Sequence, residues 1–309
     1  MPLSDVALPP LLVAPARLGE RPGAGQRVVA AVSLLWTSAL AGALIGDVDA
    51  AAPPAVRLIV DAPLPAAPEL ACYKVETATA TYFLEKSGCG LAALIDREGN
   101  DWIGFRPQPG SRGDGEFRGF PNAVHSQPGG YFHPRNQGTG PSTPRVEHSG
   151  PERVTISGVS GDSQWGCRYD FFPTHCTFTM TKLPAAGRYW VLYEGTPGGR
   201  LDDTDWWMTS GTRGRKPIAE NHEGDIPAPE WIVFGDAGLK RVLFLLHHED
   251  DGHPDRYYPM RREMTVFGFG RHRGEKFIDS VPQRFSIGLL ETTDPAAIGV
   301  ALGKISDAP

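Results

Sequence analysis

Three segments of this chain concentrate side chains that can transfer protons or hold an anionic group. They span residues 118–136, 213–223 and 247–262, and they are rich in His, Arg, Asn and Tyr among glycines and prolines. Binding and catalytic residues are concentrated on loops and strand ends of rigid β scaffolds. We therefore expect the functional site to be built from these segments.

The residue types suit β-elimination on a uronic-acid polymer. This reaction needs a cation or amide to neutralise the carboxylate, a base to remove the adjacent proton, and an acid to protonate the leaving oxygen. We predict four catalytic residues: His125, His222, His248 and Tyr257. The predicted substrate-binding residues are Arg118, Asn122, Tyr131, His133, Arg135, Trp206, Trp207 and Arg261. The alternative for each histidine is a structural hydrogen bond to the backbone.

Two adjacent tryptophans, Trp206 and Trp207, follow the acidic residues of segment 202–205. Side chains alternate along a strand, so both rings cannot point into the core, and one is expected to be a platform for a sugar ring. Glycoside hydrolysis needs two carboxylates roughly 5–10 Å apart. The acids of 202–205, or Glu220 with Glu223, could supply them, although a solvated acidic turn is the plainer interpretation.

The segment from His247 to Asp255 also contains residue types that bind metal ions. Adjacent histidines in a strand face opposite sides, and the Asp250-Asp251-Gly252 stretch lacks the alternating acids of an EF-hand loop. We predict no metal and no cofactor, with Ca²⁺ as the alternative. The sequence also has no G-x-S-x-G elbow, which leaves covalent serine catalysis unsupported.

Composition indicates the fold class. The 309 residues are 40% hydrophobic and include 37 Gly and 29 Pro, so short strands joined by turns are expected rather than long helices. The net charge is −6, and no basic run marks a nucleic-acid partner. The expected partner is a polysaccharide or oligosaccharide.

The N-terminal residues predict export. Residues 28–46 are apolar and uncharged, follow Arg21 and Arg27, and precede Val48-Asp49-Ala50, which fits a signal-peptidase site. We expect 1–50 to be an N-terminal extension with a signal peptide, and the mature protein to be secreted or periplasmic without a membrane span. If the segment is not cleaved, it is an anchor.

Four cysteines, Cys72, Cys89, Cys167 and Cys176, lie beyond this segment. An even count in an exported chain favours disulfides. Three pairings are available, and proximity in sequence favours Cys72–Cys89 and Cys167–Cys176.

The remaining chain divides into two parts. Residues 51–70 are Ala/Pro-rich and are expected to be a linker, with one short edge strand at 56–60 as the alternative, and 71–309 to be one domain. Alternating patterns predict strands at 73–84, 91–95, 153–158, 165–172, 176–183, 189–194, 231–234, 241–248, 264–270 and 284–290. Asp294 and Pro295 begin the one predicted helix. This pattern predicts an all-β fold, an antiparallel β-sandwich or open barrel with one short C-terminal helix.

The first strands resemble a known family. Thr81-Tyr82-Phe83-Leu84, Gly88-Cys89-Gly90-Leu91 and Gly99-Asn100-Asp101-Trp102 are similar to the opening strands of galactose-mutarotase-like β-sandwiches. The resemblance implies a mutarotase-like supersandwich, with a jelly-roll-like sandwich as the alternative, and a carbohydrate context. It does not supply catalytic residues.

Together these features favour a secreted carbohydrate-active enzyme, a polysaccharide lyase. A glycoside hydrolase or sugar epimerase on the same fold is one alternative. A non-catalytic glycan-binding or cell-envelope module is the other, because an aromatic platform alone can bind a sugar.

Overall fold

The computed structural model describes residues 56–107, 116–125, 130–136, 138–212, 214–261 and 263–307. The predicted signal peptide within 1–50 lies outside these residues, and export stays a prediction. No helix among the described residues has the length and apolar character to span a membrane.

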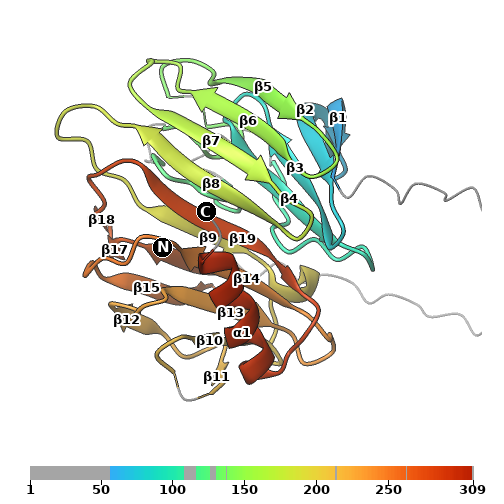
Figure 1. Ribbon diagram of the computed structural model, residues 1–309, viewed down its shortest axis with the longest axis vertical. Coiled ribbons are helices and arrows are strands. Elements are labelled where there is room, and N and C mark those ends of the chain that lie inside the picture. The colour runs from blue at the N-terminus through green and yellow to red at the C-terminus, as the bar shows by residue number, and fades with distance from the viewer. Residues whose placement is uncertain are drawn as a thin grey trace, which may run out of the picture. The chain divides into compact units, whose positions relative to one another are not determined.

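The described chain is built from antiparallel sheets (Figure 1). The first sheet is a meander with the order β1-β2-β3-β4. It consists of β1 (Arg57–Leu64), β2 (Ala67–Glu76), β3 (Ala80–Glu85) and β4 (Gly90–Asp96).

The largest sheet has nine strands in the order β11-β10-β13-β14-β19-β8-β7-β6-β5. They are β5 (Thr143–Ser149), β6 (Val154–Val159), β7 (Gly166–Phe171), β8 (His175–Lys182), β10 (Trp206–Thr209), β11 (Lys216–Pro217), β13 (Trp231–Gly235), β14 (Val242–His247) and β19 (Gln283–Leu290).

A third sheet has the order β12-β15-β16-β9. It contains β9 (Val191–Gly195), β12 (His222–Gly224), β15 (Asp255–Met260) and β16 (Met264–Phe269). The small hairpin β17 (Arg271–His272) and β18 (Glu275–Lys276) follows β16, and the 3-10 turn η1 (Pro197–Gly199) follows β9.

Aromatic side chains join the sheets into a sandwich. Tyr82 of β3 packs edge-on against Phe171 of β7, with ring centroids 5.5 Å apart. Phe234 of β13 packs against Tyr193 of β9 and Tyr257 of β15, at 5.5 and 5.3 Å. These rings are buried, so both smaller sheets face the inner side of the nine-stranded sheet. The outer side of each sheet is left for other contacts.

The C-terminal helix α1 (Pro295–Ser306) covers part of the outer face of the nine-stranded sheet (Figure 1). The Asp294 side chain accepts a hydrogen bond from the Ala297 amide (2.8 Å), as predicted for its cap. Ile298 and Leu302 pack on an apolar row that includes Val233, Val242, Phe244 and Leu246. The predicted all-β sandwich with one C-terminal helix is confirmed.

Two predictions about the first strands are wrong. Most of the expected linker 51–70 forms β1, which extends beyond the alternative strand at 56–60, and the start of β2, because apolar residues such as Ala62, Leu64 and Ala67 are buried. The single strand expected at 73–84 is two strands. The Thr77 hydroxyl bonds to the Ala80 backbone and closes a turn between them.

The predicted disulfide pairing is also wrong, since all four cysteines are buried free thiols. In the β7–β8 hairpin Cys167 is opposite Met180, whereas Cys176 is opposite Phe171. The two cysteines are therefore four residues apart in register, roughly 13 Å along the strand. The structure instead brings the Sγ atoms of Cys89 and Cys167 to 4.0 Å.

Candidate active site on the outer face of β9, β16 and β15

The first described part of the polar loop, residues 116–125, is held between two sheets by backbone hydrogen bonds. Leu91 of β4 and Phe120 exchange backbone hydrogen bonds of 2.7 and 3.2 Å, and Gly119 exchanges a pair with Glu194 of β9 (2.7 and 3.0 Å). The loop thus continues the sheet from β9 toward β4. This pairing holds its side chains beside the outer face of β9.

Asn122 and Glu194 form the centre of the site. Asn122 Nδ2 donates to Glu194 Oε2 (2.5 Å) and to the Phe117 carbonyl (2.9 Å). Asn122 has φ +47°, a left-handed conformation that Asn tolerates better than most residues. Its buried Oδ1 has no hydrogen-bond partner among the described residues. This oxygen is available to accept a hydrogen bond from a ligand.

The Glu194 side chain is only 5% exposed, and its environment changes its acidity. Burial raises the pKa of Glu194 to about 7, opposed by the Arg271 guanidinium and the Asn122 amide, while Glu116 raises it further. A carboxyl with a pKa near neutrality can both accept and donate a proton at working pH. Such a shift marks Glu194 as a candidate acid–base residue.

Cations and aromatic rings alternate beside Glu194. The Arg271 guanidinium lies 5.0 Å from the Trp190 ring centroid and 5.4 Å from that of Tyr258. Lys276 Nζ lies 4.8 Å from Trp190, and Arg256 lies 5.1 Å from Tyr258. We call these five residues the cation–aromatic ladder. Each contact is worth about 0.5–2 kcal/mol, so the ladder fixes the position of its charges.

Arg271 has hydrogen-bonding capacity to spare. Its Nη2 donates to the Tyr258 hydroxyl (3.2 Å) and its Nε to the Arg273 carbonyl (3.0 Å). Its buried Nη1 has no partner among the described residues. A Cβ at Gly268 would lie 3.0 Å from Arg271 Cδ and 2.3 Å from Leu192 Cδ2, so glycine at 268 makes room for Arg271.

Strand register explains why these groups meet. Glu194 is opposite Val266 of β16, which is opposite Tyr258 of β15. Residues in register share a face, so Glu194 and Tyr258 both point outward, away from the core rings of Tyr193 and Tyr257. The outer face of this sheet therefore carries a carboxyl, a phenol and a guanidinium.

The structure brings several predicted residues to this face. Arg118 forms a bidentate ion pair with Glu116 (2.6 and 2.8 Å), and this pairing raises the pKa of Arg118. His125 and His133 stack with ring centroids 4.8 Å apart. Burial lowers the pKa of His125 to about 3 and that of His133 to about 4, so both rings are neutral at pH 7.

The hydrogen bonds of these histidines are to the protein itself. His125 Nδ1 accepts from Asn136 Nδ2 (2.8 Å), and the two His133 nitrogens face the carbonyls of Pro134 and Phe117 (2.8 and 3.2 Å). Lys276 Nζ donates to the His125 carbonyl (3.0 Å), and burial lowers the pKa of Lys276 to about 8. His125 and His133 thus support the loop that carries Asn122.

Tyr131 and Arg135 also shape the loop. The buried Tyr131 hydroxyl bonds to the Thr139 hydroxyl (2.9 Å). The Arg135 amide donates to Glu85 (2.8 Å) from a backbone with φ +59°. Neither residue contributes to the ladder.

The prediction that His222, His248, Tyr257 and Arg261 surround the same site is wrong. Tyr257 points into the core, where its hydroxyl donates to the Ile218 carbonyl (2.6 Å). His222 bonds to the Gly224 carbonyl (3.0 Å) at the edge strand β12, and Arg261 is exposed after β15. His248 lies on the outer face of the nine-stranded sheet, bonded to Ser286 (2.8 Å).

The expected tryptophan platform is also absent, since Trp206 and Trp207 are only 6% and 3% exposed. Their side chains do point to opposite faces of β10, as predicted, but both faces are covered by other residues. Trp206 packs toward α1 with Arg215 over its ring at 4.1 Å, and Trp207 packs on Tyr257 with its Nε1 donating to the Glu220 carbonyl.

One group of described residues has the geometry to hold a metal ion. Carboxylate oxygens of Asp225, Glu230 and Asp255 lie within 4.8 Å of one another. Burial raises the pKa of Asp255, and Glu230 is hydrogen-bonded to His247 and to the Asp251 amide. Three carboxylates are ligands that Ca²⁺ accepts. Asp255 directly precedes Arg256 of the ladder, but its side chain shares the inner face of β15 with Tyr257 and accepts a hydrogen bond from the Gly270 amide (3.1 Å).

Sequence reasoning missed Glu194, Trp190, Arg271, Tyr258 and Lys276 as site residues. A signal for Glu194 was available. The strand expected at 189–194 places it on the same parity as Trp190 and Leu192, and an acid in an apolar row of a strand is unusual. The cations of the ladder carried no such signal, because Arg and Lys near turns are common.

Comparisons with known proteins agree with the fold. The structure matches HI1317 with a TM-score of 0.50 and 13% identity, over 76% of this chain and 99% of that one. A putative mutarotase (YeaD) from Salmonella typhimurium gives 0.45 and 11%, over 71% and 90% of the two chains. A galactose mutarotase related enzyme from Lactobacillus acidophilus gives 0.43 and 8%, over 72% and 98%.

No protein-family model matches the sequence, and no curated protein does. The likeness to HI1317 covers most of the sandwich and concerns the fold alone. The resemblance to galactose-mutarotase-like proteins is confirmed as a resemblance of fold.

Proposed function

We propose that this chain is a sugar epimerase of the mutarotase type, which interconverts the two anomers of an aldose by proton transfer at Glu194. The observation that carries the proposal is the buried Glu194 carboxyl with a pKa of about 7, placed among hydrogen-bonding groups without partners. Support for a sugar as the substrate comes from the names of two proteins of similar fold, a putative mutarotase and a galactose mutarotase related enzyme.

The reaction needs a base for the anomeric hydroxyl and an acid for the ring oxygen. In the proposed step the Glu194 carboxylate takes the proton from O1, the C1–O5 bond breaks as the C1=O1 bond forms, and O5 receives a proton. Rotation about the C1–C2 bond and reclosure by the reverse transfers give the other anomer. Protons and bonds are conserved, and no cofactor is required.

The neighbouring groups have defined roles in this step. Arg271 Nη1 can donate to a sugar oxygen and Asn122 Oδ1 can accept from a hydroxyl, since neither is satisfied by the described residues. The Tyr258 hydroxyl is polarised by Arg271 and can supply the proton to O5. Fixed donors of this kind stabilise developing charge without reorganising.

The test is the rate of mutarotation of freshly dissolved galactose and glucose, followed by polarimetry. Glu194→Gln keeps the shape and cannot exchange a proton, so we expect turnover to fall by about 10²–10⁴. The control Glu147→Gln removes an exposed carboxylate of β5 and should leave the rate unchanged. Unaltered mutarotation in Glu194→Gln would refute the role of Glu194.

β-Elimination is the second candidate, favoured by the spare Arg271 Nη1 and by the cations of the ladder. A guanidinium donor with no partner suits the carboxylate of a uronic acid. Incubation with polygalacturonate and alginate, followed by ultraviolet absorbance of unsaturated products, distinguishes the two reactions. Product absorbance without accelerated mutarotation would replace the first proposal by the second.

A further inference from the structure

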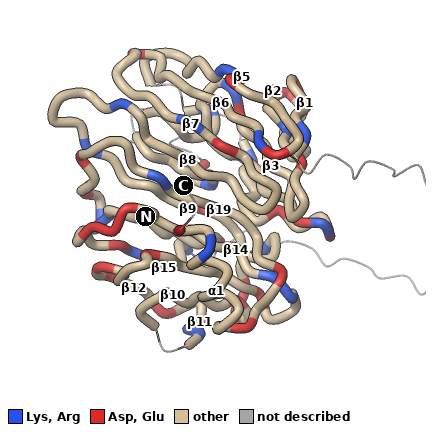
Figure 2. The backbone as a smooth tube through the Cα atoms, in the orientation of Figure 1, with Lys and Arg blue, Asp and Glu red and all other residues tan. Residues whose placement is uncertain are grey.

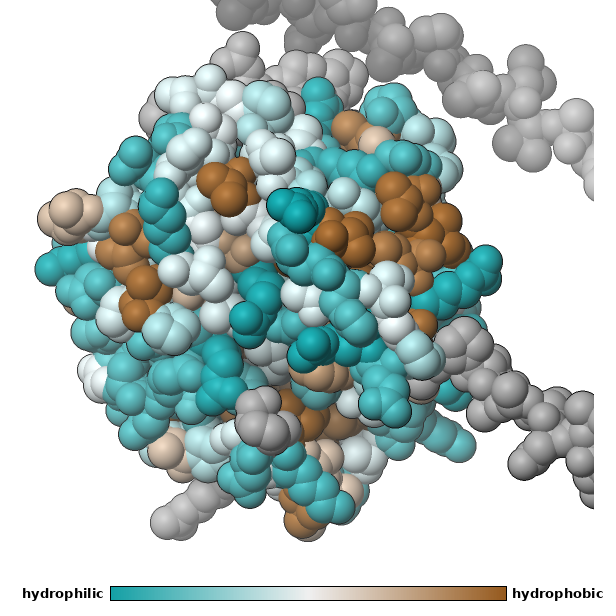
Figure 3. Space-filling model, turned by 45° about the horizontal axis from the view of Figure 1, so that its top comes forward, coloured by the Kyte–Doolittle hydropathy of each residue, from teal (hydrophilic) through white to brown (hydrophobic). Residues whose placement is uncertain are grey.

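The outer face of the nine-stranded sheet has two halves of different chemistry. On β13 and β14 the outward residues are apolar and lie under α1. On β7, β8 and β19 they are polar, and include Arg168, Asp170, Thr177, Thr179, Arg284 and Ser286. In the view of Figure 3, hydrophilic residues cover most of the visible surface, and apolar residues form separate patches. Helix α1 therefore covers the apolar half of this outer face and leaves the polar half uncovered.

A cavity of about 550 Å³ lies on the polar half, between α1 and the β6–β7 edge. Its floor carries Thr177 and Thr179, and its sides carry Phe172, His248, Arg284 and Ile305. A second cavity of about 470 Å³ adjoins it, and the two share Arg153 and Phe172. Each volume is within the usual range of about 300–1,000 Å³ for small-ligand sites.

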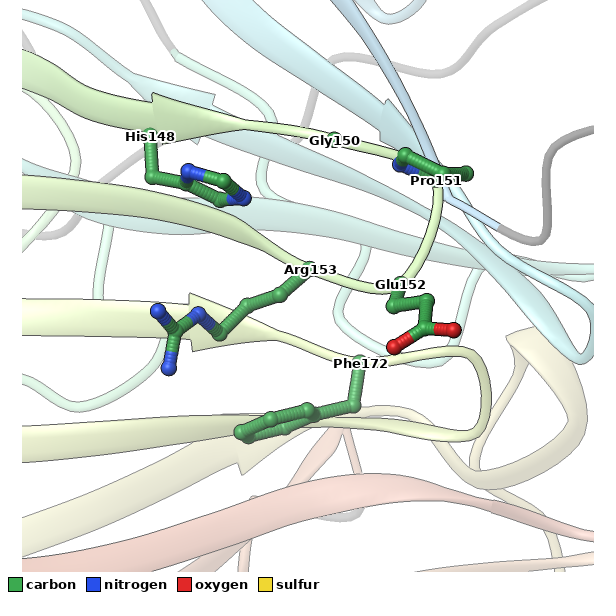
Figure 4. Close-up of a pocket in the computed structure, with 6 residues that line it drawn as sticks. All are labelled: His148, Gly150, Pro151, Glu152, Arg153 and Phe172. Carbon is green, nitrogen blue, oxygen red and sulfur yellow. The ribbon is translucent and has the colours of Figure 1, made fainter.

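The side chains around the second cavity come from neighbouring strands and the turn between β5 and β6. Figure 4 shows Arg153 and Phe172 from neighbouring strand ends beside His148 of β5 and Glu152 of the turn before β6. Because Arg153 and Phe172 line both cavities, the two form one groove across the ends of β5–β8. A groove lined from His148 of β5 to Ile305 of α1 suits a chain molecule rather than a single compact ligand.

The charges in the groove are balanced. Arg168 and Arg153 lie 2.7 and 3.9 Å from Asp170, and Arg284 lies 2.8 Å from Glu249. The lining itself carries three arginines and two carboxylates, Asp170 and Glu152, and Glu249 outside the lining pairs with Arg284, so a carboxylate lies near each guanidinium group. Figure 2 likewise shows no band of one charge over these strands. With a net charge of −6 on the whole chain, this groove gives no attraction for a polyanion.

One hydroxyl on the floor points to a ligand. Thr179 is 3% exposed, and its Oγ1 has no hydrogen-bond partner among the described residues. Thr177 differs, since its Oγ1 is 2.8 Å from Ser286 Oγ, which is in turn 2.8 Å from His248 Nε2. A buried hydroxyl without a partner costs free energy, and a ligand hydroxyl in the groove would remove that cost.

We propose that this groove binds a neutral oligosaccharide chain, at a site separate from Glu194 on the opposite outer face of the sandwich. Paired Arg and Asp side chains present planar hydrogen-bonding groups to sugar hydroxyls, the floor threonines present hydroxyls, and Phe172 presents an aromatic face. The proposal does not depend on the reaction at Glu194, and it adds a binding function to the fold.

The experiment is isothermal titration calorimetry of the chain with neutral β-1,4-linked tetrasaccharides of glucose, mannose, xylose and galactose, and with tetragalacturonate. At least one neutral tetrasaccharide should bind, and tetragalacturonate should bind more weakly. Phe172→Ala should weaken binding tenfold or more, while Phe172→Trp should retain it. Glu194→Gln should bind like the unaltered protein.

Thr179→Val separates a binding role from a structural one. It removes an unsatisfied hydroxyl, so the melting temperature should not fall, while affinity should drop severalfold. The matched control is Thr155→Val on β6, whose hydroxyl donates to Asp170 (2.7 Å) and is absent from the groove lining. That variant should melt earlier yet retain more affinity than Phe172→Ala.

Any of four outcomes would overturn the proposal. The first is no binding of any neutral tetrasaccharide. The second is binding that persists in both Phe172→Ala and Thr179→Val. The third is tighter binding of tetragalacturonate than of every neutral chain, which would assign the groove to acidic ligands. Loss of binding in Glu194→Gln alone would show that the saccharide binds at the Glu194 site, on the other face, and not in the groove.

Discussion

The two outer faces of the sandwich hold their polar groups in different ways. On the β9–β16–β15 face a carboxyl is buried, and its pKa of about 7 follows from poor solvation. On the β7–β8–β19 face the Arg–Asp and Arg–Glu pairs are partly exposed, and their side chains border an open groove. Burial near a cation suits proton transfer, whereas exposed paired charges suit hydrogen bonding to a ligand. The comparison assigns chemistry to one face and binding to the other.

Stability against pH gives the largest expected difference between the faces. Burial raises the pKa of Glu194 from 4.5 to about 7, so the folded protein binds a proton more tightly than the unfolded chain. Stability from this group is full below pH 4.5 and is lost as pH rises through 7. Above pH 7 Glu194→Gln should therefore be more stable, by at most about 3 kcal/mol.

Thermal or urea unfolding at pH 5 and pH 8 measures this effect. The difference between Glu194→Gln and the unaltered protein should grow with pH. Asp170→Asn on the groove face should show no such gain at high pH, because this carboxylate is paired with two arginines and accepts from Thr155. Equal pH dependence for both variants would remove the distinction between the faces.

The next prediction concerns the effect of Arg271 on the rate of mutarotation. Arg271→Gln removes the cation that favours the charged form of Glu194, so the pKa of Glu194 and the pH midpoint of activity should both rise. The loss of a hydrogen bond from a charged donor is worth about 1.5–3 kcal/mol, so turnover at neutral pH should fall roughly tenfold to a hundredfold. The pH–rate profile is the measurement, and Arg200→Gln, at an exposed site, is the control.

The helix cap provides the smallest effect and concerns only the groove. Asp294→Ala removes the acceptor for the Ala297 amide and should cost about 1 kcal/mol. Since Ile305 at the other end of α1 lines the groove, saccharide affinity should weaken slightly. Mutarotation should stay unchanged, as measured side by side on the same preparation. A larger effect on mutarotation than on binding would contradict the separation of the two sites.

The sequence predicted the local features of this protein well. Alternation located most core strands and the 165–183 hairpin, and Asp294-Pro295 located the start of α1. The density of His, Arg and Asn in 118–136 marked the loop that carries Asn122. Strand alternation, helix caps and turns depend on residues that are close together in the chain. Their preferences follow from backbone geometry, so one sequence is enough to predict them.

Tertiary structure alone decided which polar groups meet. Asn122 and Glu194 are 72 positions apart, and only the pairing of Gly119 with β9 brings them together. Alternation does not distinguish His247 from the predicted His248, because apolar residues share parity with each. Helix α1 covers the row of Val242, Phe244 and Leu246, and the groove begins at His248 on the same row, while His247 is buried on Phe285. Which face of a strand is covered depends on distant elements, and local alternation does not encode it.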